Sequence, residues 1–226
     1  MEIKVLSSLA TREAYLELVP QYERASGHKV ATTWAGTADI MKRIGAGEIH
    51  DLIISSSKSL GDLIAQGKVA AGPTTLAKCG IGLAVRAGAR RPDVGSAEAF
   101  KRAMLAAKTI GYSTGPSGVY LGGLFERMGI SDAVKAKIRQ VPSGMTVGPI
   151  IASGEAEIGF QQVSELAHVE GIDYIGALPA DLQSITVFQA GLHTAAPQPA
   201  AATTLAAFLV TPAAGAVMRK HGLETA

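Results

Sequence analysis

The chain alternates short apolar strands with helical segments, and this alternation limits the folds that it can adopt. Residues 27–57 show the pattern. An apolar strand at 29–34 leads into a turn of small residues, a helix begins at Thr37, and the next strand, at 52–55, runs into three serines. Strands that alternate with helices pair mostly in parallel, with helices on the faces of the sheet. The pattern therefore predicts an α/β fold.

The same alternation continues along the rest of the chain. Further strands are expected at residues 3–6, 78–86, 109–112, 137–141, 157–160, 172–175 and 186–192. The helix expected at residues 11–25 has apolar residues at helical spacing. Pro20 lies inside it and predicts a kink or a restart near Val19, because proline cannot donate the helical hydrogen bond.

With 226 residues, of which 47% are hydrophobic and 18% charged, the chain can form two lobes, each with its own core. The expected division is lobe I at residues 1–82 plus 188–226, and lobe II at residues 83–187. The strands near 78–86 and 185–192 are expected to cross between the lobes. They would then act as a hinge, near Ala84 and Ile185.

Hydroxyl residues and glycines gather where strands end and helices begin. In lobe I these residues are Ser7, Ser8, Gly36, Thr37 and Ser55, and in lobe II the turn at 113–118 contains Ser117 and Gly118. Each of the hydroxyl residues could serve as an ordinary helix cap that needs no ligand. Helix N-termini also carry unpaired N–H groups and partial positive charge, so the repeated arrangement predicts a site for a small anion.

Charge and histidine spacing argue against several other classes of function. The formal net charge is +2, and Arg90 and Arg91, the nearest approach to a basic run, are interpreted as a solvated loop, so no nucleic-acid partner is expected. The single cysteine, Cys79, allows no intrachain disulfide. The five histidines have no metal-ligand spacing, so neither a metal nor another cofactor is expected.

The chain has no run of about 18 apolar residues, and no membrane span is expected. Its opening residues, MEIKVLSS, are typical of a strand and not of a signal peptide. We therefore expect a cytoplasmic protein, or a periplasmic one if a leader has been removed, and a monomer in either case.

Several runs of sequence, each loose by itself, are fairly specific in their order and spacing: VLSSLA at 5–10, YERASGHKV at 22–30, WAGT at 34–37, IGAG at 44–47, HDLIIS at 50–55, SGEAEIG at 153–159, AFLVTPAAG at 207–215 and KHGL at 220–223. With these runs the chain resembles the type II periplasmic substrate-binding proteins, and within them the molybdate-binding group, over nearly its whole length. The resemblance implies two lobes, each with a mostly parallel central sheet and helices on both faces, which close around a ligand.

The resemblance also implies how the ligand is held. Hydroxyls and backbone N–H groups would bind a tetrahedral oxyanion such as molybdate, tungstate, sulfate or phosphate, and an ABC transporter permease would be the protein partner. Ser143 and Gly144 match second-lobe contacts of the family. Where the family offers a tyrosine, this chain has Gln162, preceded by Gln161. An amide both donates and accepts hydrogen bonds, so the ligand could instead be a carboxylate or another organic acid.

Two functions of different class follow from this reading. The first is a solute-binding protein without chemistry of its own, which the sequence favours. The second is an isomerase of small organic polyacids such as aconitate, since some relatives with this fold catalyse that reaction. Moving a proton requires a positioned base. The candidates for this role are Asp39, Tyr112, Tyr120 and Glu165, none of which forms an obvious acid/base pair.

Overall fold

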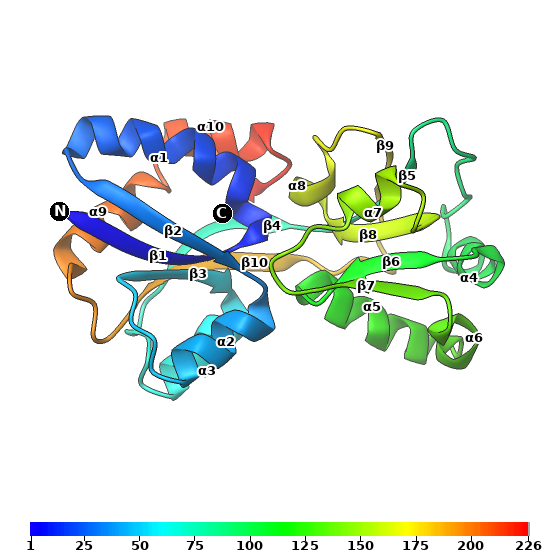
Figure 1. Cartoon of the computed structure of the whole chain (residues 1–226), viewed down its shortest axis with the longest axis horizontal. Helices are drawn as coiled ribbons and strands as arrows, with labels where there is room; N and C mark the ends of the chain where they lie inside the picture. The colour runs from blue at the N-terminus through cyan, green and yellow to red at the C-terminus, as the bar shows by residue number, and fades with distance from the viewer. Residues whose placement is uncertain (226) are drawn as a thin grey trace. The chain divides into compact units, whose positions relative to one another are not determined.

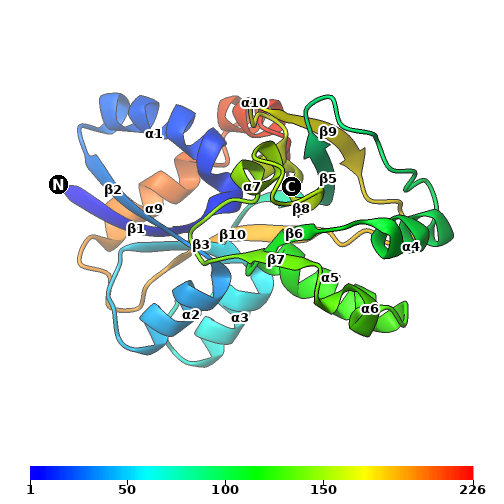
Figure 2. The ribbon, with the colours of Figure 1, turned by 45° about the vertical axis from the view of Figure 1, so that its right-hand side comes forward.

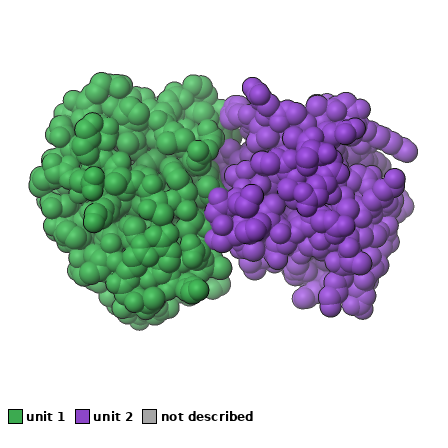
Figure 3. All heavy atoms as spheres, in the orientation of Figure 1, with its two compact units in different colours: residues 1–79, 186–226 green, residues 80–185 purple. Residues whose placement is uncertain are grey.

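The computed structural model describes residues 1–225, which form two compact units (Figure 3). The first unit comprises residues 1–79 and 186–226, and the second residues 80–185. The sequence had placed residues 80–82 in the first unit and 186–187 in the second. Each unit is an α/β structure with its own sheet, so the two-unit α/β architecture expected from the sequence is confirmed.

The first unit contains a six-stranded sheet in the order β11-β4-β10-β3-β1-β2. Its elements are β1 (Glu2–Ser8), a 3₁₀ turn (Leu9–Thr11), α1 (Arg12–Ser26), β2 (Lys29–Ala35), α2 (Thr37–Gly45), β3 (Leu52–Ser56), α3 (Ser57–Ala65), β4 (Thr74–Cys79), β10 (Thr186–Leu192), α9 (Pro199–Phe208), α10 (Pro212–Lys220) and β11 (Glu224–Thr225). Strand β1 pairs in parallel with β2 and β3, whereas β10 runs antiparallel to β3 and β4. The sheet is therefore mixed, with a parallel core of three strands.

Helices cover both faces of this sheet. Helices α1 and α10 lie on one face, and α2 and α3 lie on the other (Figure 1). The Tyr22 hydroxyl of α1 joins α9, with 2.7 Å to the Thr204 hydroxyl and 3.1 Å to the Ala201 carbonyl. Helix α1 continues through Pro20, so the restart expected near Val19 does not occur. Burial of one face of α1 outweighs the hydrogen bond that proline removes.

The second unit contains a five-stranded sheet in the order β7-β6-β8-β5-β9. Its elements are β5 (Ile81–Arg86), α4 (Ala97–Ala106), β6 (Ile110–Ser113), α5 (Pro116–Arg127), α6 (Ser131–Lys135), β7 (Ile138–Val141), α7 (Gly148–Ala152), β8 (Ile158–Gln162), α8 (Val163–Leu166) and β9 (Ile172–Ala177). Strand β6 pairs in parallel with β7 and β8, and β5 runs antiparallel to β8 and β9. Figure 2 shows β6 and β7 side by side, with α5 and α6 beneath them.

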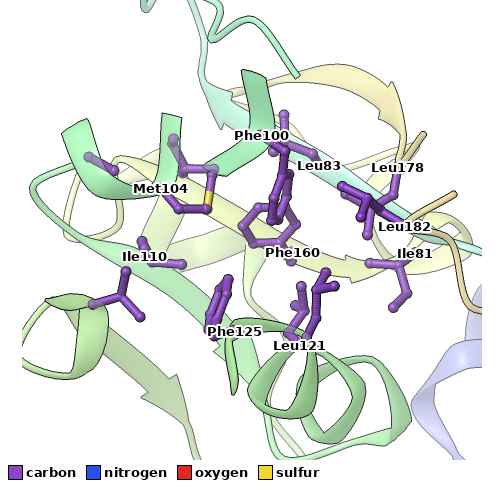
Figure 4. Packing of buried hydrophobic residues seen from close by; sticks show 14 of the residues in the cluster. Ile81, Leu83, Phe100, Met104, Ile110, Leu121, Phe125, Phe160, Leu178 and Leu182 are labelled. Atoms are coloured by element: carbon purple, nitrogen blue, oxygen red, sulfur yellow. The ribbon is translucent and has the colours of Figure 1, made fainter. Parts of the chain in front are cut away.

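The core of the second unit is centred on Phe160 of β8. Its ring meets Phe100 of α4 edge-on at 5.8 Å, and Phe100 stacks on Phe125 of α5 at 6.5 Å (Figure 4). Neighbouring Leu83 and Ala84 of β5 belong to different clusters, Leu83 to this one and Ala84 to the cluster that contains α7 and α8. Both faces of the sheet are therefore covered, as the sequence predicts.

The strand expected at residues 78–86 is in fact two strands, β4 and β5, separated by Gly80. Strand β4 pairs in the first sheet and β5 in the second, so one continuous strand cannot serve both. The Gln183 side chain holds the start of β5, accepting from Ile81 N at 2.7 Å and donating to Ile81 O at 3.0 Å. A Cβ on Gly80 would lie 3.0 Å from Gln183 Nε2, so a larger residue would disturb this contact.

Within residues 1–225 no single helix has the length and apolar character needed to cross a membrane, although α9 and α10 meet those criteria as a pair bent by 66°.

Two buried histidines lie beside the first sheet, one just before β3 and one just after β10. The His50 Nε2 atom is 2.8 Å from Glu48, and the His193 Nδ1 atom accepts from Ala195 N at 3.0 Å. The remaining ring nitrogen of each histidine is buried without a partner among the described residues. Burial, followed by the nearby charges of His50 and Lys68, lowers the pKa of His193.

We expect His193→Asn to flatten the pH dependence of stability on the acid side. Because the native pKa of His193 lies below that of the unfolded chain, the unfolded state binds more protons once the pH falls below about 6.5, and stability decreases there. Asparagine can keep the acceptor for Ala195 N but does not titrate. Urea unfolding at pH 7, 6 and 5 measures the effect. His28→Asn, which removes a partly exposed ring, is the control, and an equal slope in both variants would contradict the assignment.

Candidate functional site

The first unit brings its predicted anion-binding residues to one edge of the sheet. Ser7 of β1 lies opposite Trp34 of β2 and Ile54 of β3, and all three strands run in the same direction. Their carboxyl ends therefore meet. This edge carries Ser8, the turn that begins at Gly36, and the serines that end β3, and it is the edge at which open α/β sheets bind ligands.

Two hydroxyls at this edge are buried without a hydrogen-bond partner among residues 1–225, namely Thr37 Oγ1 and Ser55 Oγ. Ser55 is 0% exposed. A buried hydroxyl without a partner costs about 1–3 kcal/mol, and such groups are rare in native proteins. A ligand that accepts hydrogen bonds would satisfy both hydroxyls, and this favours the predicted ligand role for Thr37 and Ser55.

Ser7 and Ser8 are already engaged locally. The Ser7 hydroxyl donates to the Ser8 carbonyl at 3.2 Å and lies 3.3 Å from the Thr11 hydroxyl. The Ser8 hydroxyl accepts a long bond, 3.5 Å, from Ala10 N and so caps the 3₁₀ turn. The capping interpretation therefore accounts for both side chains, and their role toward a ligand stays a prediction.

Helices α2 and α5 begin in the same way, although they belong to different units. Each has a glycine at the N-cap, Gly36 or Gly115, and no side chain caps its first turn. Each also carries an unpartnered buried hydroxyl in that turn, Thr37 in α2 and Ser117 in α5. Helix α3, in contrast, is capped by the Ser56 hydroxyl, which accepts from Ser59 N at 3.3 Å. The first turns of α2 and α5 therefore present uncapped N–H donors to an anion.

Close backbone packing holds the N-terminus of α5 against the end of β6. A Cβ on Gly118 would lie 1.7 Å from the Ser113 carbonyl oxygen, a separation that only glycine permits. The Ser113 hydroxyl accepts from Gly115 N at 3.2 Å and shapes the turn. Gly118 thus acts through the backbone, and it places Ser117, which is 1% exposed, at this edge.

Ser143 and Gly144 follow β7, whose last residue, Val141, lies opposite Ser113 in the parallel pairing of β7 with β6. Both residues are exposed, and Gly144 has a φ of +83°, the left-handed region that favours glycine. The turn therefore lies at the same edge of the second sheet as Ser117. Its contact with a ligand stays a prediction.

Two glutamines end β8, and both are 1% exposed. Side chains alternate along a strand, so Gln162 shares the face of Phe160 and α5, and Gln161 points to the other face. Gln161 Oε1 accepts from Val147 N at 2.7 Å, and its Nε2 donates to Glu165 Oε1 at 2.6 Å. The sequence singled out Gln162, whose role toward a ligand stays a prediction, and the structure adds Gln161, which connects Val147 to Glu165. In the sequence, the only sign of the contact between Gln161 and Glu165 is their spacing of four residues.

Glu165 is the acid/base candidate with the most perturbed environment. The residue as a whole is only partly buried, but protein encloses its carboxyl group, and this burial raises its pKa to about 8. Hydrogen bonds from the Gln162 backbone and the Gln161 side chain oppose the shift. The group is therefore mostly protonated at neutral pH, a state in which it can donate a hydrogen bond.

The other three candidates have structural partners. The Asp39 carboxylate is 3.9 Å from Arg43, and its side chain is 40% exposed. The Tyr120 hydroxyl donates to the Leu182 carbonyl at 3.1 Å. Burial raises the pKa of Tyr112, whose ring packs 6.4 Å from that of Phe125. None of the three shares the combination of burial and amide contact found at Glu165. Among residues 1–225 no three His, Cys, Asp or Glu side chains gather as metal ligands.

A profile of the family described as bacterial extracellular solute-binding protein matches residues 3–224. The chain belongs to this family. Among its relatives, an aconitate isomerase from a Pseudomonas species is 35% identical over 229 residues, which cover 98% of this solute-binding-family chain and 87% of that protein.

Solved structures confirm the fold of this member of the solute-binding family. The periplasmic molybdate-binding protein of Azotobacter vinelandii has a TM-score of 0.83 at 19% identity, over 99% of both chains. The sulfate-binding protein SubI of Mycobacterium tuberculosis H37Rv has a TM-score of 0.80 at 16% identity, over 100% of this chain and 87% of that one. The fold implied by the resemblance to type II periplasmic binding proteins is therefore confirmed.

Proposed function

We propose that this protein isomerises a small polycarboxylic acid of the aconitate type, with Glu165 moving the proton. The observation that carries the proposal is the enclosed, mostly protonated Glu165 carboxyl, bound to Gln161 at the carboxyl end of β8. The 35% identity to an aconitate isomerase, over 98% of this chain, supports the same reaction class.

Uncharged donors would hold the carboxylates of the substrate. The unpartnered hydroxyl of Ser117, in the same unit as Glu165, can donate one hydrogen bond, and the first turn of α5 adds backbone N–H groups and helix-dipole charge. A protonated Glu165 adds no negative charge beside a polyanionic substrate.

The reaction would be a 1,3-shift of one proton. Ionised Glu165 removes a proton from the CH₂ group next to a carboxylate, and the C–H electron pair becomes the new C=C bond. The electrons of the old C=C bond take the proton back from Glu165 at the other end of the three-carbon unit. Charge that develops on the adjacent carboxylate during the transfer is stabilised by the fixed donors. After each turnover Glu165 is ionised again, and the substrate has neither gained nor lost protons or electrons.

Proton NMR of cis- and trans-aconitate incubated with the protein tests this function. We expect interconversion of the two isomers and, in D₂O, deuterium at the exchanging carbon. Because Glu165 must lose its proton to act as the base, kcat/KM should rise with pH and level off above about 8. Glu165→Gln should lower kcat by about 10²–10⁴-fold, the usual contribution of a general base, while aconitate still raises Tm.

Binding variants test the donors separately from the base. Ser117→Ala, in the same unit as Glu165, should weaken aconitate binding about tenfold or more, the effect of losing a hydrogen bond to a charged group. Ser153→Ala, an exposed serine, is the control. Absence of isomerisation by the wild-type protein would refute the catalytic proposal. Unchanged turnover in Glu165→Gln would refute only the role of that residue.

A second candidate is a binding protein for a tetrahedral oxyanion, without chemistry. The three unpartnered hydroxyls favour it, since an oxyanion needs such donors and no base. Calorimetry with molybdate, tungstate, sulfate, phosphate and aconitate separates the two functions. We expect the strongest binding for aconitate. Strong binding of one inorganic oxyanion, together with no turnover of aconitate, would select the second candidate.

A further inference from the structure

A pocket of about 360 Å³ lies in the second unit, near the start of β8 and not at its carboxyl end. Its lining residues come from β5, the loop that follows it, α4 and the start of β8. Ile158 begins β8 and Gln162 ends it, so roughly 13 Å of strand separates the pocket from the edge that carries Gln162. The volume is within the usual range for small-molecule sites.

The floor of the pocket is apolar because α4 presents small residues on one face. Ala99, Ala103 and Ala106 line the pocket, at the spacing that places side chains on the same side of a helix, and Ala107 lines it just after the helix ends. Val85 and Ile158 complete the floor. Larger side chains at these positions of α4 would fill the space, so the alanines leave it open.

Three arginines, Arg90, Arg91 and Arg102, line the same pocket. Among residues 1–225, none of the three has a carboxylate within ion-pair distance. The carboxylates of both acidic residues of the pocket accept hydrogen bonds from backbone N–H groups. Asp93 accepts from Gly95 N at 3.1 Å, and Glu157 accepts from Lys108 N at 2.6 Å. The pocket therefore has an excess of positive charge beside an apolar floor.

We propose that this pocket binds a small organic anion that joins one carboxylate, sulfonate or phosphate group to an apolar body. Guanidinium groups recognise such anions through paired hydrogen bonds, and the alanine floor accepts the apolar part. The residues differ in kind from those proposed to hold the substrate, which are uncharged. Arg90 and Arg91 are exposed in the loop after β5, as the sequence predicts, and the proposal adds a binding role to this loop.

Fluorescence titration with 1-anilinonaphthalene-8-sulfonate tests the pocket, since this probe has an anionic group on an aromatic body. We expect saturable binding at one site and at least tenfold weaker binding of the neutral N-phenyl-1-naphthylamine. Arg91→Gln combined with Arg102→Gln should weaken binding of the sulfonate at least tenfold. Ala106→Leu, which fills the pocket from an exposed position of α4, should weaken binding of both probes.

Arg24→Gln, which removes one positive charge from an exposed position in the first unit, is the control and should leave binding unchanged. Excess aconitate should not displace the probe, which separates this pocket from the proposed substrate site, and circular dichroism confirms that each variant is folded. Equal binding of the sulfonate by the double arginine variant and by Arg24→Gln would overturn the proposal. So would equal affinity for the two probes, or displacement of the sulfonate by aconitate.

Discussion

Gly118→Ala is expected to destabilise the protein by about 3 kcal/mol or more. The new Cβ would lie 1.7 Å from the Ser113 carbonyl oxygen and 2.8 Å from its carbon, so the backbone of β6 or α5 has to move. Overpacking that side chains can absorb costs about 1–3 kcal/mol, and a clash with backbone atoms exceeds this range. Urea denaturation measures the loss, and ligand binding should weaken as well because Ser117 moves with the helix.

Gly122→Ala is the matched control in the same helix. No atom lies within 4 Å of a Cβ built at Gly122, and alanine favours a helix by up to about 1 kcal/mol over glycine. We therefore expect this variant to be slightly more stable than the wild type. Equal stability of the two variants would mean that the close approach of α5 to β6 is not present in the protein in solution.

Glu165→Gln is expected to make the protein more stable at alkaline pH. Burial raises the pKa of Glu165 from 4.5 to about 8, so the native state holds a proton that the unfolded chain releases. The contribution of this group is most favourable below pH 4.5 and declines as the pH rises toward about 8, where the loss is complete. Glutamine has the same shape, still accepts from Gln161 and does not titrate.

At pH 9 the variant should exceed the wild type in unfolding free energy by an amount on the order of 2 kcal/mol, since each pKa unit corresponds to about 1.4 kcal/mol and relaxation around the ionised group reduces the sum. At pH 5 the two proteins should be nearly equal. Urea unfolding at pH 5, 7 and 9 measures the difference, with the exposed Glu155→Gln as control. A constant difference between Glu165→Gln and wild type across this range would show that Glu165 is not buried as described.

Much of the fold could be predicted because it depends on local patterns. Each segment expected to be extended does contain strand residues, since apolar runs bounded by turns are visible one segment at a time. The split of residues 78–86 into β4 and β5 was missed, because only pairing with two different sheets, through β10 and β8, reveals it. Pro20 likewise lies inside an unbroken helix for a tertiary reason, the burial of one face of α1.

The candidate site also combines features that the sequence predicts with features that only the tertiary structure shows. The sequence identified the hydroxyl-rich strand ends, among them Thr37, Ser55 and Ser117, since strand-to-helix turns are local features. It could not show that these hydroxyls lack partners while Ser7 and Ser8 have them, because that depends on neighbouring segments. The contact of Gln161 with Val147 is equally non-local.

By itself, the amino-acid sequence determined that donors without charge would gather at the carboxyl ends of parallel strands, because hydrophobic periodicity and turn residues act over a few positions. Only the tertiary structure decided the protonation state of Glu165 and grouped Arg90, Arg91 and Arg102 around one pocket. The free energy of a charged group depends on how much water the rest of the fold removes from it, and no short stretch of sequence contains that information.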